Sequence, residues 1–168
     1  MKILCMGWAS LSEGSKEGGG YNLATQLYCE WLSEKDDVSY LRSIYDDAQK
    51  NSPDVVEERS LKGIKCYKLV GSSLKAPASL NNNNYFSKVT DAEDRCIVQF
   101  IEKNQFQVVH FHSHECFSKK LPGKIKEKLP DVKLISTIHD SFFICPRVHF
   151  FYKYKQPCSK MTYNTHCD

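Results

Sequence analysis

Short apolar runs alternate with amphipathic stretches along the first 140 residues of the chain. Residues 3–8 form an uncharged apolar run, which predicts a strand buried on both faces. Over residues 21–35, apolar side chains recur every three or four positions, the period of one helix face. That face comprises Tyr21, Ala24, Leu27, Tyr28, Trp31 and Leu32. Residues 38–45 and 63–70 predict two more strands, and the strict alternation of the second predicts an edge or half-covered position.

The same order of strand and helix continues further along the chain. Asp91 can cap a helix over residues 92–104, whose first turn is acidic, as the helix dipole favours. Its buried stripe would comprise Cys96, Ile97, Phe100 and Ile101. Strands are predicted at residues 107–112 and 132–138, and a lysine-rich helix from about Gly123 separates them.

Strands separated by helix-length segments predict an α/β fold: a Rossmann-like, mostly parallel sheet with helices on both faces. The polar residues 46–59 and the asparagine-rich residues 71–88 are expected to be loops. Residues 141–168 are aromatic and basic and contain no clear strand. Because an open sheet of five strands needs a further helix to cover its last face, we expect residues 1–168 to be a truncated piece of something longer.

The composition narrows the class of protein. Of 168 residues, 41% are hydrophobic and 26% are charged, which excludes a disordered, collagen-like or coiled-coil chain. No apolar run reaches the roughly 18 residues of a membrane-spanning helix, so we expect a soluble or peripheral protein. Residues 2–9 have the outline of a signal peptide, but charged residues follow where a cleavage site should lie, which favours a first strand.

The net charge of +3 is uneven, because residues 101–168 carry 11 basic and 6 acidic residues. This excess suits a phosphorylated ligand or an anionic membrane surface. It does not indicate nucleic acid, which calls for a basic stripe with interleaved aromatic residues. The lysine-rich segment 119–128 is expected to be a solvated helix packed on the sheet; its alternative is docking on an anionic membrane.

The eight cysteines fall into two groups. The first five lie singly inside periodic apolar segments and are expected to be reduced, buried thiols of a cytosolic protein. The others, with two histidines, form what we call the late cluster: Cys145, His149, Cys158, His166 and Cys167. No Cys-x-x-Cys pair is present, so a zinc site there would need residues from further along; otherwise these are thiols on a surface excursion.

Ligands of open parallel sheets bind outside the carboxyl ends of the strands, and three segments fall there. Gly18, Gly19 and Gly20 begin a helix, where backbone N–H groups can approach an anion; the alternative is a flexible turn. They do not match the dinucleotide fingerprint. His139 and Asp140 directly follow a strand, where an imidazole and a carboxylate can bind hydroxyl groups or act as a base.

The third segment contains His110, His112 and His114. Alternating strand residues share a face, so the three imidazoles could bind one metal. No acidic or cysteine ligand recurs at matching spacing, however. We therefore expect no metal, with one histidine hydrogen-bonded in the core and the others lining a cleft.

Taken together, four stretches resemble the N-terminal domain of a GT-B fold glycosyltransferase of the group 1 type, family 4. They are residues 1–4, 18–20, 107–113 and 136–147, and the last is the most specific. In one bacterial subgroup, many of whose members belong to polysaccharide and capsule clusters, a similar stretch is followed by an excursion with cysteines, as in residues 155–158 here.

The resemblance implies that this domain binds mostly the acceptor, while a C-terminal Rossmann-like domain, absent from these 168 residues, binds the nucleotide sugar. Gly18, Gly19 and Gly20 would face the donor diphosphate, and His139 would approach the transferred sugar.

The acceptor, a glycan or a lipid-linked glycan, would be bordered by His112, Ser113 and Glu13. The family retains the anomeric configuration and needs no bound metal or other cofactor. We expect the piece alone to be inactive. We expect the protein to be cytoplasmic, either free or peripheral on the inner face of the membrane. Two alternatives stay open. One is a non-catalytic module that holds a glycan or a partner protein. The other is a nucleotide-dependent oxidoreductase, although the spacing of the glycines argues against it.

Overall fold

The computed structural model describes residues 1–43, 52–71, 91–114, 117–139, 151–152 and 156–157. In chain order its elements are β1 (Lys2–Gly7), the 3₁₀ segment η1 (Leu11–Lys16), α1 (Gly19–Ser33), β2 (Asp37–Ser43), β3 (Asp54–Glu57), β4 (Lys65–Val70), α2 (Asp91–Asn104), β5 (Val108–Phe111), α3 (Leu121–Lys128), β6 (Lys133–Ser136), β7 (Phe151–Tyr152) and β8 (Gln156–Pro157). Asp140, Cys116, the late cluster and nearly all of the expected loop 71–88 lie outside the described residues.

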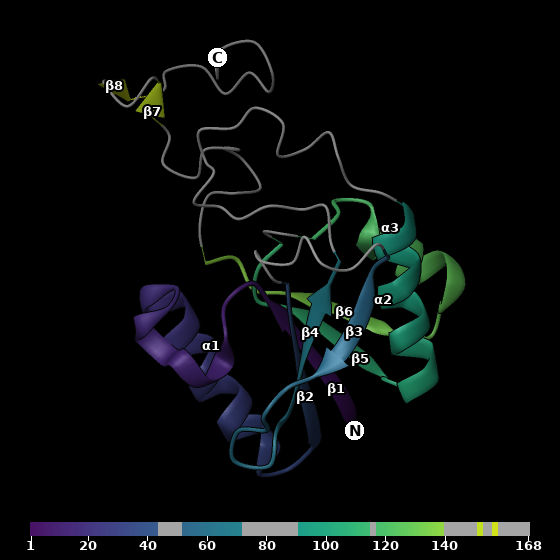
Figure 1. Ribbon diagram of the computed structural model, residues 1–168, viewed down its shortest axis with the longest axis horizontal. Coiled ribbons are helices and arrows are strands. Elements are labelled where there is room, and N and C mark those ends of the chain that lie inside the picture. The colour runs from purple at the N-terminus through teal and green to yellow at the C-terminus, as the bar shows by residue number, and fades with distance from the viewer. Residues whose placement is uncertain (44–51, 72–90, 115–116, 140–150, 153–155, 158–168) are drawn as a thin grey trace.

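Six strands form one sheet in the order β3-β4-β2-β1-β5-β6, while β7 and β8 pair separately (Figure 1). Every neighbouring pair in the large sheet is parallel except β3 with β4. The predicted Rossmann-like α/β class is therefore confirmed. Because β1 has β2 on one side and β5 on the other, its residues from Ile3 to Gly7 are all buried, as the uncharged run predicts.

The prediction of a loop over residues 46–59 is wrong at its end, where β3 forms an additional edge strand. Its two apolar residues are flanked by acids, too short a pattern to distinguish from loop, and pairing with β4 decides the conformation. As a result β4 lies one strand in from the edge, half-covered through Tyr67 and Lys68.

The helices cover both faces of the sheet (Figure 1). On one face α2 and α3 pack through Ile97, Ile101, Leu121 and Ile125 against side chains that include Leu4 of β1. On the other face α1 packs through Cys29, Tyr28 and Leu32 against Cys5 and Tyr40. Residues of opposite parity on each strand therefore enter two separate cores. No described helix is both long and apolar enough to cross a bilayer.

The buried face of α1 differs from the predicted one. Asn22, Thr25 and Cys29 are buried, whereas Leu27 and Trp31 are more than half exposed. The physical reason lies in the loop before the helix: the Asn22 side chain donates to the carbonyl oxygens of Ser10 at 2.7 Å and Gly14 at 2.9 Å. These bonds turn a polar side chain inward and rotate part of the apolar stripe toward solvent.

The other helices follow the predictions closely. In α2, Ile97 and Ile101 are buried, with Cys96 and Phe100 packed beside them. The third helix, α3, begins at Leu121, two residues before the predicted start, because a proline is well tolerated in a first turn. The described cysteines Cys5, Cys29, Cys66 and Cys96 are free, the first three buried, as expected of reduced core thiols.

Gly7 is held by close packing at the end of β1. A Cβ atom there would lie 2.3 Å from the Tyr21 hydroxyl oxygen and 2.4 Å from that of Tyr40. Tyr40 is 1% exposed, and its hydroxyl donates to the Ala9 carbonyl oxygen at 2.9 Å, so it has little room to move.

We therefore expect Gly7→Ala to lower the free energy of unfolding by about 1–3 kcal/mol, the usual cost of an overpacked core. Gly123→Ala is the matched control, because its Cβ would meet no atom within 4 Å in the described part of the chain. Urea unfolding of both variants measures the difference. Equal stabilities would contradict the packing argument.

Candidate functional site

The carboxyl ends of β1, β5 and β6 meet at one edge of the sheet, which we call the rim. Their parallel registers, with Met6 beside Phe111 and Phe111 beside Ser136, bring the residues that follow these strands together. The amide of His112 donates to the Met6 carbonyl oxygen at 2.8 Å, and that of Thr137 to the Phe111 carbonyl oxygen at 2.8 Å. The predicted histidine segments at residues 110–114 and 139 therefore lie at this rim, and the loop that leads to Gly18 begins there.

The loop from β1 to α1 is folded back on the first turn of the helix. Besides the two bonds from Asn22, the Ser10 amide donates to the Glu17 carboxylate at 2.7 Å. Gly14 (φ 53°) and Gly18 (φ 82°) adopt positive φ values that favour glycine. A Cβ at Gly18 would also come within 3.1–3.3 Å of three neighbouring atoms. Gly18 is thus required by the turn itself.

Gly19 and Gly20 differ from Gly18 in having space around them. Both are exposed, and a Cβ atom on either would meet no described atom within 4 Å. They form the amino end of α1, a helix of 15 residues, where free amide groups and the helix dipole favour an anion. This geometry can accept a phosphate; the predicted contact with a donor diphosphate stays a prediction.

His139 lies at the rim beside the start of α1. Its ring makes an edge-on contact with Tyr21, the residue after Gly20, at 5.1 Å between centroids. It also stacks on His112 at 5.9 Å. The predicted glycine segment and the predicted imidazole are therefore brought together. Tyr21 connects the two segments. The sequence predicted it only as part of the apolar helix face, although its position directly after the glycines could have indicated a place at the site.

The alternating histidines occupy different environments. His110 is buried and its Nε2 lies 2.7 Å from the Thr137 hydroxyl, as expected for one core histidine. His114 is half-buried and its Nε2 lies 2.8 Å from the Ser136 hydroxyl. His112 is 3% exposed and Ser113 is 7% exposed.

The predicted acceptor residues thus divide by exposure. Glu13, in η1, is exposed and available to a ligand. The ring of His112 lies under Tyr28, with 5.0 Å between centroids, so a ligand would reach it only after that ring moved. The acceptor roles of Glu13, His112 and Ser113 stay predictions.

Burial makes the two inner histidines weak bases. Desolvation, with smaller repulsion from His110 and His139, lowers the pKa of His112 to about 3. Desolvation, followed by the effect of His139, also lowers the pKa of His110. Both imidazoles are therefore neutral at physiological pH and can accept hydrogen bonds or bind as ligands through an unprotonated nitrogen.

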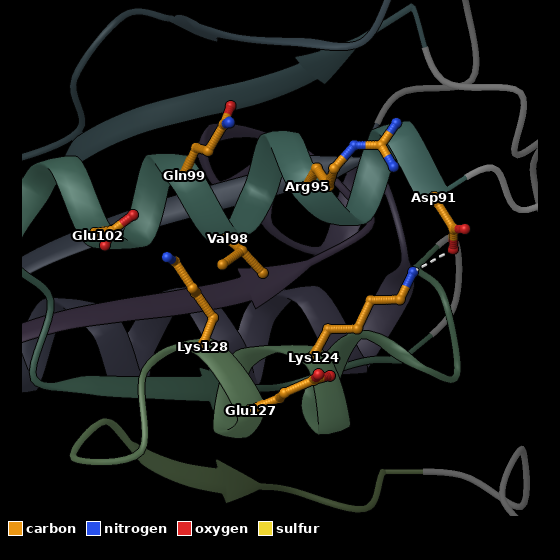
Figure 2. A pocket seen from close by; sticks show the side chains of 8 residues that line it. All are labelled: Asp91, Arg95, Val98, Gln99, Glu102, Lys124, Glu127 and Lys128. Atoms are coloured by element: carbon orange, nitrogen blue, oxygen red, sulfur yellow. Dashed lines mark hydrogen bonds and ion pairs between the residues drawn. The ribbon is translucent and has the colours of Figure 1, made fainter.

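A separate hollow of about 570 Å³ lies between α2 and α3, the helices on the face of the sheet opposite α1 (Figure 2). Charges of both signs line it, and Lys124 at its edge pairs with Asp91 at 2.5 Å and with Asp94 at 2.8 Å. Ion pairs that include an exposed partner contribute at most about 1 kcal/mol each. Because these charges neutralise each other, they leave little net charge to attract a ligand. We therefore place the candidate site at the rim.

The low pKa of His112 makes stability depend on pH. Below about pH 6.5 the unfolded chain binds a proton at this residue and the folded chain does not, until the pH approaches 3. We expect the free energy of unfolding to decrease as the pH falls from about 6.5 towards 3, with His112 contributing up to about 1.4 kcal/mol per pH unit.

His112→Leu is the test variant, since it removes the titrating ring and two buried nitrogens. Its unfolding free energy, measured by urea titration from pH 7 to 4, should fall less steeply than that of the wild type. Parallel pH profiles would show that His112 is not buried in its neutral form.

Comparison with known proteins supports the fold. A sucrose-phosphate synthase from Thermosynechococcus elongatus has a similar structure, with a TM-score of 0.52 and 10% sequence identity; the match covers 93% of this chain and 37% of the synthase. At this identity the likeness shows the fold alone. This chain spans little more than a third of the length of that protein. No family model and no curated protein sequence matches the chain.

Proposed function

We propose that this chain is the acceptor-side half of a retaining glycosyltransferase of the GT-B type, family 4. The enzyme would move a sugar from a nucleotide-diphospho-sugar to a glycan or lipid-linked acceptor, in the cytoplasm of a bacterium that builds a surface or capsular polysaccharide. The observation that carries the proposal is the contact of the open Gly19–Gly20 helix start, through Tyr21, with His139. The similar fold of a sucrose-phosphate synthase, itself a sugar-transferring enzyme by name, supports it.

Each group at the rim has a defined task in this reaction. The bond between the anomeric carbon and the diphosphate oxygen breaks, leaving negative charge on the diphosphate. The amides of Gly19 and Gly20 would bind that charge as it develops, and the second domain would hold the nucleotide. The acceptor oxygen forms the new bond to the anomeric carbon and releases its proton to a base, for which Asp140 is the candidate. His139 would hydrogen-bond the transferred sugar and orient it.

A matched pair of glycine variants tests the diphosphate contact. Gly20→Ala and Gly123→Ala each add one methyl group at an exposed position near the start of a helix, where it meets no described atom within 4 Å, so neither should harm the fold. A methyl group at position 20 would, however, hold a diphosphate away from the amides. We expect the affinity of the complete natural protein for UDP-glucose or GDP-mannose, measured by calorimetric titration, to fall about tenfold for Gly20→Ala and to be unchanged for Gly123→Ala.

Equal affinities in the two variants would exclude the glycine segment as a diphosphate site. Binding of an oligosaccharide by the complete natural protein, without any response to nucleotide sugars, would instead favour the non-catalytic module. Rapid sugar transfer by the isolated chain would contradict the division of labour between two domains.

A histidine variant tests the sugar contact. In the complete natural protein, we expect His139→Ala to lower kcat/KM for sugar transfer by about 100-fold, since it removes a group that orients the reacting sugar. Ile138→Ala is the control, because Ile138 is its neighbour on the same strand end and 69% exposed. An unchanged kcat/KM for His139→Ala would remove this residue from the site.

A further inference from the structure

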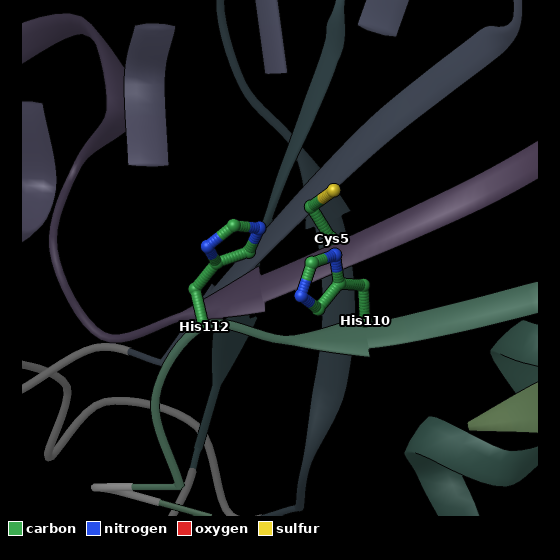
Figure 3. A group of neighbouring side chains, drawn as sticks. All are labelled: Cys5, His110 and His112. Carbon is green, nitrogen blue, oxygen red and sulfur yellow. The ribbon is translucent and has the colours of Figure 1, made fainter. Parts of the chain in front are cut away.

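A thiol and two imidazoles meet beneath the rim, on the face of the sheet that α1 covers (Figure 3). Cys5 of β1 is the register partner of His110 of β5, and His112 follows two residues later with its side chain on the same face. One candidate ligand atom from each residue lies within 4.8 Å of the other two. All three residues are at least nine-tenths buried: Cys5 is 0%, His110 4% and His112 3% exposed.

Among the described residues, three of the four ring nitrogens in this cluster lack the hydrogen-bond partners that buried polar atoms normally have. Nδ1 of His110 and both ring nitrogens of His112 have no hydrogen-bond partner in the part of the chain that the structure describes. Each unsatisfied buried group costs about 1–3 kcal/mol. Three such atoms side by side indicate a group that binds there.

The outer nitrogen of His110 is held in the way that metal-binding histidines usually are. With the proton on Nε2, the ring donates to the Thr137 hydroxyl at 2.7 Å, and Nδ1 presents its lone pair to the cluster. Such a second bond fixes the tautomer and the orientation of a ligating imidazole. Tyr28 packs edge-on against the other side of His110 at 5.1 Å and lies against His112, so both rings are restrained.

We propose that Cys5, His110 and His112 form a metal site whose fitting ion is Zn²⁺. One thiolate and two imidazoles are a donor set that Zn²⁺ prefers over Mg²⁺ or Ca²⁺, which take oxygen ligands. Bond lengths of about 2.0–2.3 Å would draw the three ligand atoms together by about 1 Å, within reach of side-chain rotation. Cys29 of α1, a buried thiol in the same core as Cys5, is a candidate for a fourth ligand.

The protonation states suit this chemistry. Burial lowers the pKa of both histidines, so their nitrogens are unprotonated at neutral pH and compete with no proton for the metal. Binding breaks the S–H bond of Cys5 and forms a bond from its sulfur to the metal, and the proton goes to the solvent. No electron is transferred in this step.

The site would tie β1 to β5 directly below the rim, where His112 stacks on His139. The proposal does not rest on the proposed function, since it depends on the buried cluster alone. Its test therefore uses metal ions without nucleotide or sugar, and either hypothesis can fail without the other.

The experiment is a titration of the chelator-treated, reduced chain with Co²⁺, followed by displacement with Zn²⁺. We expect one Co²⁺ per chain at this site, with the visible bands of tetrahedral cobalt and the near-ultraviolet band of a cobalt–thiolate bond. Cys5→Ala and His112→Leu should each weaken binding by about 100-fold or more, given that loss of a supporting group alone costs 10–100-fold. Zn²⁺ at about 100 times its dissociation constant should raise the wild-type Tm by about 5–10 °C.

Two controls separate this site from others. Cys66→Ala removes a buried thiol from the same core, and His114→Ala removes the next histidine of the row; both should keep the cobalt spectrum. A variant with serine at all three late-cluster cysteines should keep it too. Circular dichroism shows whether each variant is folded. If one of the two site variants fails to fold, the other still tests the proposal.

The proposal is overturned if the wild-type chain binds no Co²⁺. It is equally overturned if the thiolate band persists in folded Cys5→Ala or His112→Leu, or disappears in the late-cluster variant. Retention of the band in both controls and in the late-cluster variant, with loss in the site variants, establishes the site.

Discussion

The parallel pairing of β1 with β2 on one side and β5 on the other is the constraint on which the rest of the structure depends. It buries the first strand from Ile3 to Gly7 and places Cys5 between Tyr40 and His110. It also makes β1, β5 and β6 end together, so that the residues following each strand share one edge. A shift of one residue in this register would turn the imidazoles of β5 into the opposite core, against α2 and α3.

Alternate side chains on β5 face opposite sides of the sheet, and one of the two sides receives buried histidines. Val109 and Phe111 enter the core under α2 and α3, where apolar side chains surround them. His110 and His112 enter the other core, where an aliphatic side chain would satisfy folding better. Positions at which a sequence departs from the pattern that folding alone requires are where function is expected, and here the departure lies beside the rim.

The sequence predicted most of the sheet because its strands are strongly patterned. The uncharged run of β1 and the apolar start of β5 could hardly form anything else in an α/β chain. The sequence-based prediction was wrong where an element depends on contacts outside its own segment. The strand β3 exists because β4 offers it an edge, and the rotation of α1 follows from the bonds of Asn22 to the preceding loop. Neither effect is visible in local periodicity.

At the rim, the sequence could place only those residues that directly follow a patterned strand or begin a patterned helix. Gly19, Gly20 and His139 could be placed there because the ends of parallel strands coincide. The sequence could not place Cys5 beside the histidines, because 105 residues separate it from His110 and only the register joins them. It also assigned His112 to a cleft, since alternation alone does not show that Tyr28 covers the ring.

The crowding at Gly7 has a consequence for how this protein can evolve. Two tyrosine hydroxyls, from α1 and β2, occupy the space that any side chain at position 7 would need. Even alanine there requires that both phenols lose their oxygen atoms and that the ring of residue 40, whose Cζ lies 3.3 Å from the Cβ position, shifts slightly, so we expect the three positions to vary together. During evolution the tyrosines would have to be substituted before Gly7. A mutant library that varies position 7 alone, selected for stability, should therefore recover mainly glycine.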